Sequence, residues 1–286
     1  METWKLVSLV AVIVVLGIGG AGAFFALSFF AEAEPAVLDE FSGTVQITRG
    51  TEAITAAQGL VLQQGDSVKT GEGSATILLF GGSIIRLDKE TEVVLTELDG
   101  EAGNVRVTLA SGEIWNRVVR ASDDPNLERV AKVSGLRSYS VEMADAVATV
   151  RGTGFGCSAR GPPSVSVAHG SVGFRQRAAT VETPVVRQTA VLRNSRVETT
   201  PLVETPWITK NLAADKSFDQ RLLREIRGKY GVLIKYVKQT YGWTDADIDK
   251  AILDYLSSGG GSIKDVSSIC ERVGEAVVVG ERRGNC

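Results

Sequence analysis

The feature that most constrains this chain is an apolar stretch near its N-terminus. Residues 6–31 (LVSLVAVIVVLGIGGAGAFFALSFFA) contain no charged side chain over 26 positions. As a helix rising 1.5 Å per residue, this stretch would be about 39 Å long, which exceeds the roughly 30 Å hydrocarbon core of a bilayer. We therefore expect residues 1–31 to form a short cytoplasmic tail and a single transmembrane helix.

The charges that flank the stretch predict its orientation. Lys5 precedes it, whereas acidic residues follow it at Glu32, Glu34, Asp39 and Glu40. Positive charge is retained on the cytoplasmic side of a membrane. The sequence thus predicts a single-pass protein of a bacterial-type cytoplasmic membrane, with its N-terminus inside and the bulk of the chain extracytoplasmic.

The alternative for this stretch is a secretory signal peptide that is cleaved after Ala33. Residues 31–33 (AEA) have the small-residue pattern of a cleavage site. The apolar core of a signal peptide usually has 7–15 residues, so the length of this one favours a retained anchor. Both alternatives place the rest of the chain outside the cytoplasm.

The charge balance and the cysteines give limited information about possible partners and ligands. The 31 basic and 34 acidic residues leave a net charge of −3, which argues against nucleic acid as a partner. The three cysteines have no metal-ligand spacing. In an oxidising compartment Cys270 and Cys286 could form a disulfide and leave Cys157 free, but their spacing does not decide this.

Residues 40–197 have the pattern of a β domain. From Gly43 to about Arg177, short segments rich in Val, Ile, Thr and Leu alternate with turn residues, among them GTVQITR, SATILLF, SIIRLD, EVVLTEL and AVATVRG. This rhythm predicts an antiparallel sandwich or roll. Residues 121–138 interrupt it as a polar loop, and residues 185–197 resume it. Residues 32–40 predict a short polar segment that follows the membrane helix.

The C-terminal part has a helical period. Residues 198–209 contain two prolines and predict a linker, and residues 210–286 predict a small helical unit. Helix starts with capping-box character occur at Thr244 and Ser262. The first helix is indicated by apolar side chains four positions apart, namely Phe218, Leu222, Ile226 and Tyr230.

No residue pattern predicts catalysis, a cofactor or a metal. The single histidine, His169, ends a predicted strand without other ligands nearby, and Cys157 has no neighbouring base. The glycine-rich run 152–156 is followed by a strand rather than by the helix that a dinucleotide fingerprint requires. The acids of 245–249 lack the glycine and glutamate of an EF-hand. We therefore expect a protein that is not an enzyme.

Four segments of the β region resemble the FecR domain: residues 65–88, 109–115, 139–155 and 164–174. They contain a Gly-Asp-x-Val-x-Thr stretch before one strand and a Val-Arg-Gly-Thr-x-Phe stretch after another. We expect these residues to be architectural, and Trp115 to be a core anchor. The set is Gly65, Asp66, Val68, Thr70, Gly71, Gly73, Trp115, Val150, Arg151, Gly152, Thr153 and Phe155.

The resemblance implies a solenoid-like β roll of two sheets in the periplasm or cell envelope, used for protein–protein signalling. The best-known members of the family carry a cytoplasmic anti-sigma domain before their membrane helix. Here only five residues precede the apolar stretch, and the C-terminal part is helical. We therefore do not expect direct regulation of a sigma factor.

These observations predict a membrane-anchored extracytoplasmic interaction or scaffold module built on a FecR domain. The expected partner is an envelope protein or polymer, with no cofactor and no nucleic acid. An alternative is a signal-transducing subunit that contacts a separate cytoplasmic effector through the Gly/Ala cluster at 19–23. A third hypothesis is an envelope enzyme or carbohydrate-binding protein that uses a groove in the roll.

Overall fold

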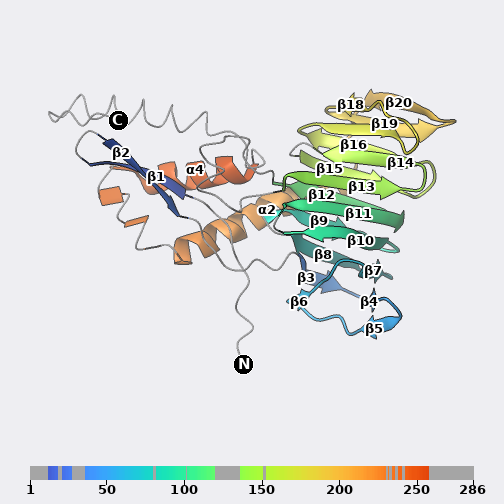
Figure 1. The fold of residues 1–286 in the computed structure, drawn as a ribbon, viewed down its shortest axis with the longest axis horizontal. Helices are drawn as coiled ribbons and strands as arrows, with labels where there is room; N and C mark the ends of the chain where they lie inside the picture. Colours follow the sequence, from blue (N-terminus) through green and yellow to red (C-terminus); the bar gives the residue numbers. More distant parts are fainter. Residues whose placement is uncertain are drawn as a thin grey trace.

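The protein forms a β roll with two long sheets and a helical unit beside it (Figure 1). A computed structural model describes residues 12–18, 21–27, 36–79, 82–100, 102–119, 136–150, 153–229, 231, 234–235, 238–239 and 242–257. The mainly β, two-sheet fold expected from the sequence is confirmed.

Each sheet of the roll has nine strands. Sheet I runs in the order β18 (Thr183–Val185), β17 (Val172–Gln176), β14 (Ala146–Val150), β13 (Ser138–Met143), β11 (Asn104–Ser111), β10 (Glu92–Asp99), β7 (Ser67–Thr70), β4 (Val45–Arg49) and β5 (Glu52–Ile54). Sheet II runs in the order β20 (Arg196–Pro201), β19 (Gln188–Arg193), β16 (Ser164–His169), β15 (Thr153–Ser158), β12 (Glu113–Val118), β9 (Ile84–Leu87), β8 (Ser74–Leu79), β3 (Ala36–Ser42) and β6 (Leu60–Val61).

The chain builds the roll by alternating between the sheets. Hairpin β8–β9 lies in sheet II, β10–β11 in sheet I, β13–β14 in sheet I and β15–β16 in sheet II. One pair departs from the expected antiparallel pattern, because β11 and β13 are parallel, with Val107 opposite Val141. Strand β12 lies in the other sheet between them, so the chain re-enters sheet I in its earlier direction.

The core lies between the two sheets and follows the period-two pattern of the sequence. Alternate side chains of β8 and β11 are buried, as expected for strands with one face inward. The largest members of this core include Leu38, Ile77, Tyr139, Phe155 and Phe174, each at most 1% exposed. Burying each such side chain contributes about 1.5–3 kcal/mol.

The structure alters two expected boundaries of the β domain. Residues 36–40, expected as part of a polar exit from the membrane, belong to β3, because Ala36, Val37 and Leu38 are apolar enough to be buried. Strand β20 extends to Pro201 within the expected linker, since its β-branched Thr199 and Thr200 pair with β19. The connection to the first helix is therefore residues 202–205.

Two helices follow the roll. Helix α2 (Pro206–Lys229) begins with a proline at its first position, where no N–H is needed, and Thr205 accepts the N–H of Ile208 at 3.3 Å. Helix α4 (Asp245–Ser257) begins at the expected capping box, in which Asp247 accepts the backbone N–H of Thr244 at 2.9 Å. The helix expected from Ser262 lies outside the described residues, as do Cys270 and Cys286.

The N-terminal stretch differs from its expected form. Strands β1 (Val12–Ile18) and β2 (Ala21–Leu27) form an antiparallel pair where hydropathy predicts a helix. The first strand is rich in β-branched residues, which favour strands, whereas in lipid the unpaired edges of a hairpin would favour a helix instead. No helix in the described parts of the chain is long and apolar enough to span a membrane. Membrane anchoring therefore stays a prediction.

Candidate functional site

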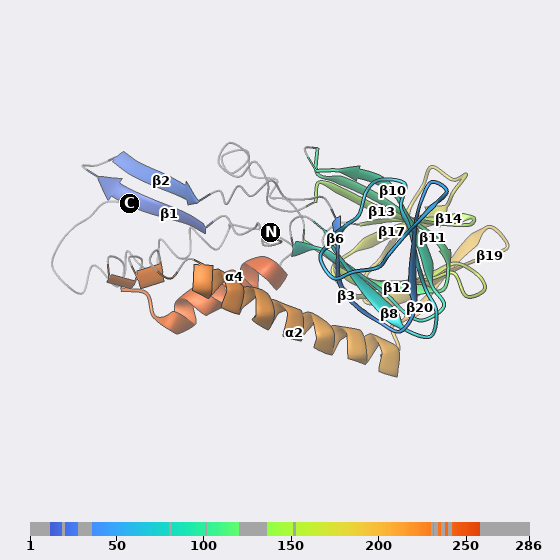
Figure 2. The same ribbon diagram turned by 90° about the horizontal axis from the view of Figure 1, so that it is seen from below.

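The candidate site is the outer face of sheet II, which helix α2 covers. We call it the covered face and define it by Ile84, Arg86, Trp115, Arg117, Gly156 and Ala168. Figure 1 shows α2 reaching the roll beside β9 and β12, and Figure 2 shows one end of the same helix lying next to the roll. Apolar contacts and ion pairs join the helix to these strands, as described below.

Strand β12 is buried on both of its faces. Ile114 and Val118 point into the core between the sheets, whereas Trp115 packs with Ala168 and with Ile208 of α2. Trp115 is 0% exposed, but it lies under the helix rather than in the core between the sheets. Its indole ring meets that of Trp207 edge-on, with centroids 5.8 Å apart.

Two glycines of β15 make room on the covered face. A Cβ atom at Gly156 would lie 2.6 Å from Cζ3 of Trp207, well inside van der Waals contact. A Cβ atom at Gly154 would lie 2.3 Å from Cε1 of His169. The glycine at position 156 is therefore required for the tryptophan of α2 to reach the sheet.

Charged side chains pair across the contact between helix and sheet. Arg86 of β9 donates to Asp215 at 2.5 Å, and Arg117 of β12 donates to Asp219. The indole N–H of Trp115 donates to the second carboxylate oxygen of Asp215 at 2.9 Å. Asp215 and Asp219 of the helix are thus each held by an arginine of the sheet through a charge-assisted hydrogen bond.

Burial makes these charges costly. The side chains of Arg117 and Asp219 are 5% and 17% exposed. Burial lowers the pKa of Arg117, although the carboxylates of Asp219 and Asp215 oppose the shift. Burial likewise raises the pKa of Asp219, against the attraction of Arg117. The loss of hydration thus offsets part of what the two charges gain by pairing, and the bond between them fixes the position of the helix on the sheet.

A second group of contacts lies further along the helix. Arg221 donates to Asp39 at 2.5 Å and to Glu40 at 2.8 Å, which fastens α2 to β3. Its guanidinium also lies over the ring of Phe218, 4.9 Å from the centroid. The apolar side of this region is formed by Ile84 with Phe218, Leu222, Leu223 and Ile248.

His169 lies at the edge of the covered face, at the end of β16. Its Nδ1 accepts the backbone N–H of Gly154 at 3.0 Å, so this nitrogen carries no proton. Burial lowers the pKa of His169, with Asp215 acting in the opposite direction. Among the described residues, no group of three or more His, Cys, Asp or Glu side chains could hold a metal ion.

The family-motif residue Asp66 lies in a different place, at the N-terminal end of the roll. Its side chain is fully buried and accepts two bonds from Arg49, at 2.9 Å from Nε and 2.8 Å from Nη2. It also accepts the backbone N–H of Gln63 at 2.8 Å. The carboxylate therefore joins β4 to the turn that precedes β7.

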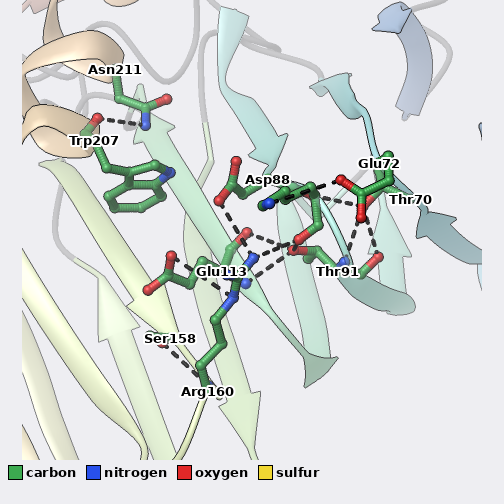
Figure 3. A network of polar contacts seen from close by, with 10 residues as sticks. Thr70, Glu72, Asp88, Thr91, Glu113, Ser158, Arg160, Trp207 and Asn211 are labelled. Carbon is green, nitrogen blue, oxygen red and sulfur yellow. Dashed lines mark hydrogen bonds and ion pairs between the residues drawn. The ribbon is translucent and has the colours of Figure 1, made fainter. Parts of the chain in front are cut away.

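Thr70 joins the two sheets at one corner of the roll (Figure 3). Its hydroxyl donates to the carbonyl of Asp88 at 2.6 Å and accepts the N–H of Thr91 at 3.0 Å. The hydroxyl of Thr91 in turn donates to the carbonyl of Glu113 in β12 at 3.1 Å. Arg160 pairs with Asp88 at 3.4 Å on the outside of this corner.

The other motif residues lie in different parts of the roll. Val68, Val150 and Phe155 are buried, and Gly73 approaches the backbone of Ser42 too closely for any side chain. Gly65 and Gly71 lie in the segments that flank β7, and Thr153 begins β15. Arg151 and Gly152 lie outside the described residues. Among the motif residues whose side chains the structure describes, Trp115 alone lies on the covered face.

Acid should weaken the roll at Asp66. Burial alone would raise the pKa of Asp66, but the hydrogen bonds from Arg49 and Gln63 and the charge of Arg49 lower it. A carboxyl with a lowered pKa adds stability above its unfolded pKa of about 3.8, and this is lost as pH falls through the folded value. We expect the unfolding free energy to fall more steeply below about pH 5 in the unaltered protein than in Asp66→Asn. Equal slopes in urea titrations across this range would contradict the prediction.

The thiol of Cys157 should be unreactive in the folded protein. Cys157 is a free, buried cysteine of β15, and burial strongly raises the pKa of its thiol. We expect no reaction with a thiol reagent at pH 8 until denaturant is added, since the thiolate is the reactive form. The measurement uses a variant with Cys270→Ser and Cys286→Ser, so that Cys157 is the only thiol. Rapid labelling without denaturant would show that β15 opens in the native state.

Sequence reasoning did not identify the charged residues of the covered face. Arg86 and Arg117 occupy outward positions of strands, where charge normally indicates solvent. A signal was present in α2, where Trp207, Asn211, Asp215 and Asp219 recur four apart and so share a face with apolar residues. Carboxylates within the apolar face of a helix indicate basic partners.

The fold and the covered face define a class: a two-sheet β roll that binds a helix on its outer surface. A family model described as "FecR protein" matches residues 66–173, from the turn before β7 into β17. The protein therefore contains a FecR domain.

Two crystal structures are similar to part of this chain. Both are of a protein described as a "putative anti-sigma factor" from Parabacteroides distasonis, at 2.50 and 1.65 Å resolution. Each has 16% sequence identity and a TM-score of 0.37, over 48% of this chain and 59% of the other. This chain thus spans about three fifths of the protein it matches. No curated protein matches the chain.

Proposed function

We propose that this protein is a membrane-anchored, extracytoplasmic protein-interaction module of the cell envelope, in which the FecR roll binds polypeptide on the outer face of sheet II. The observation that carries the proposal is the covered face itself. Gly156, the buried Trp115, the buried Arg117 and the partly buried Arg86 form a surface shaped for a helix.

The proposed location has support from the sequence. The apolar stretch 6–31 is long enough to cross a bilayer, and Lys5 precedes it while acidic residues follow. A protease added to spheroplasts should remove an epitope placed at the C-terminus and spare one placed at the N-terminus. Protection of the C-terminal epitope would contradict an extracytoplasmic roll, and the mass of the mature N-terminus distinguishes a retained anchor from a cleaved one.

A second surface supports the binding of proteins. Strand β20 is the last strand of sheet II and is largely exposed, with exposed valines nearby at Val186 and Val203. At the corresponding end of sheet I, strand β18 contains Pro184, which removes a hydrogen-bond donor from that edge. The β20 edge is therefore the more open of the two for a partner strand.

The proposal is tested by capturing partners in the native envelope. The tagged full-length protein is crosslinked in intact cells and compared with Arg86→Gln/Arg117→Gln. The control is Arg193→Gln, which changes an arginine whose side chain is 58% exposed on β19. We expect an envelope protein that is enriched at least 10-fold with the unaltered protein and the control, and at least 5-fold less with the double variant. Capture at background level in all three would contradict the proposed function.

A further inference from the structure

We infer that the covered face is an exchangeable helix-binding site, in which α2 is the resident occupant and an amphipathic helix of the same chemistry is the partner. The partner helix would carry a tryptophan followed eight and twelve residues later by carboxylates, as Trp207, Asp215 and Asp219 do in α2. The inference rests on the proposed function and deepens it, because it names the class of partner that the same face binds.

The shape of the face selects an aromatic side chain at one position. The main chain of β15 at Gly156 forms the floor under Trp207, and Trp115 forms the wall that its ring meets edge-on. Leu202 and Leu212 pack around this cluster. A smaller side chain in place of Trp207 would leave the floor uncovered and lose the contacts of a buried aromatic ring.

The charges of the face select carboxylates at two further positions. Arg86 and Arg117 have side chains that are 15% and 5% exposed beneath the helix. An occupant without acids at these positions would leave the guanidinium groups of Arg86 and Arg117 beneath it without their carboxylate partners, which is strongly unfavourable. The indole N–H of Trp115 would likewise lose its acceptor, Asp215.

The roll does not depend on α2 for its core. The main hydrophobic cluster, from Ala36 to Leu192 and with Val197 packed against it, draws all of its members from the strands and connections of the roll. The helix contacts the sheet through two smaller, separate clusters around Ile84 and around Trp115. Departure of the helix would therefore uncover one outer face and leave the inter-sheet core closed.

The helix is attached to the face through charged groups that lose hydration on contact. Arg117 and Asp219 are 5% and 17% exposed, and burial lowers the pKa of Arg117 and raises that of Asp219, which opposes the gain from their pairing. The connection of residues 202–205 contains the exposed Val203 and begins after the edge strand β20. The helix can thus leave the face without unpairing the sheet.

The test measures whether a peptide with the sequence of α2 binds to the covered face. A fluorescent synthetic peptide of residues 204–229 is titrated into the full-length protein and followed by anisotropy. A second full-length protein carries Asp215→Asn and Asp219→Asn, which weaken the resident helix. We expect the peptide to bind this variant with a Kd at least 10-fold lower than the unaltered protein. A peptide with the same two substitutions should bind either protein at least 10-fold more weakly.

The control is Lys216→Gln in the full-length protein, which changes an exposed residue between the two acids and should leave the affinity unchanged. Near-UV circular dichroism verifies that each variant keeps its folded roll. If the Asp→Asn variant does not fold, the same titration uses a protein cleaved at a protease site inserted within 202–205. Absence of saturable binding to a folded release variant would overturn the inference, as would equal binding of the two peptides.

The outcomes separate this inference from the proposed function. Capture of an envelope partner without any exchange of the peptide would overturn the inference alone. Exchange of the peptide without any envelope partner would contradict the proposed function and support the helix-binding chemistry of the face.

Discussion

Valine at position 156 should release helix α2 and leave the roll folded. The new side chain would lie in the space that the Trp207 ring occupies, since even a Cβ atom comes within 2.6 Å of it. The ring has little room to move because Trp115 lies against it at 5.8 Å between centroids. Overpacking of this kind costs about 1–3 kcal/mol. Position 156 lies in β15, where a β-branched residue suits the extended backbone.

The release is measured by hydrogen exchange and by tryptic cleavage within α2. We expect cleavage at Lys210 and Lys216 to become at least 10-fold faster in Gly156→Val, while the amides of β12 and β15 stay protected. The matched control is Gly154→Ala on the same face of the same strand. There the added atom meets only the imidazole of His169 at the end of β16, so the substitution disturbs the bond between His169 and Gly154 but does not reach the ring of Trp207. Unchanged protection of α2 in Gly156→Val would show that the helix does not need this contact.

Alanine at position 66 should lower the unfolding free energy of the roll by about 2–3 kcal/mol. The substitution leaves the guanidinium of Arg49 without its carboxylate and the backbone N–H of Gln63 without its acceptor. Removing one partner of a fully buried pair costs about 3–5 kcal/mol, and we expect less here because the Arg49 side chain is 33% exposed. The effect is measured by urea denaturation at pH 7 with linear extrapolation.

Two comparisons make the Asp66 prediction specific. Glu92→Ala removes a partly exposed ion pair with Lys69 and a long hydrogen bond from Ser67 on the neighbouring strand, and it should cost about 1 kcal/mol or less. Asp66→Asn should fall between these variants, since the amide oxygen can still accept one bond. A cost for Asp66→Ala no greater than that for Glu92→Ala would show that the buried pair contributes little to the roll.

Much of the fold could be predicted from the sequence, because its signals are local. The period-two segments became strands with alternate side chains buried, as in β8 and β11. The capping box at Thr244 is also a local signal, because it is formed by hydrogen bonds between two residues that are three positions apart, Thr244 and Asp247. Strand β3 was missed because acids at Asp39 and Glu40 follow its short apolar run, and nothing in the sequence shows that Arg221 pairs with both.

The apolar stretch shows the limit of local signals. Its length predicts a transmembrane helix, whereas the structure has the pair β1 and β2 there. An apolar, β-branched sequence is compatible with both a helix and a strand pair. The surrounding medium decides between them, since lipid requires every backbone group to be paired within the segment.

The sequence alone determined a mainly β region of short period-two strands, with motifs that resemble the FecR domain, and the helix that begins after Thr244. These depend on hydrophobic period, turn residues and capping, which act over a few positions. Only the tertiary structure decided that Trp115 and Arg117 face a helix rather than the core or solvent. Asp215 and Asp219 meet their partners from about 100 positions away in the sequence. A pairing over that distance depends on how the sheet is ordered and where α2 packs, and no local pattern of residues contains that information.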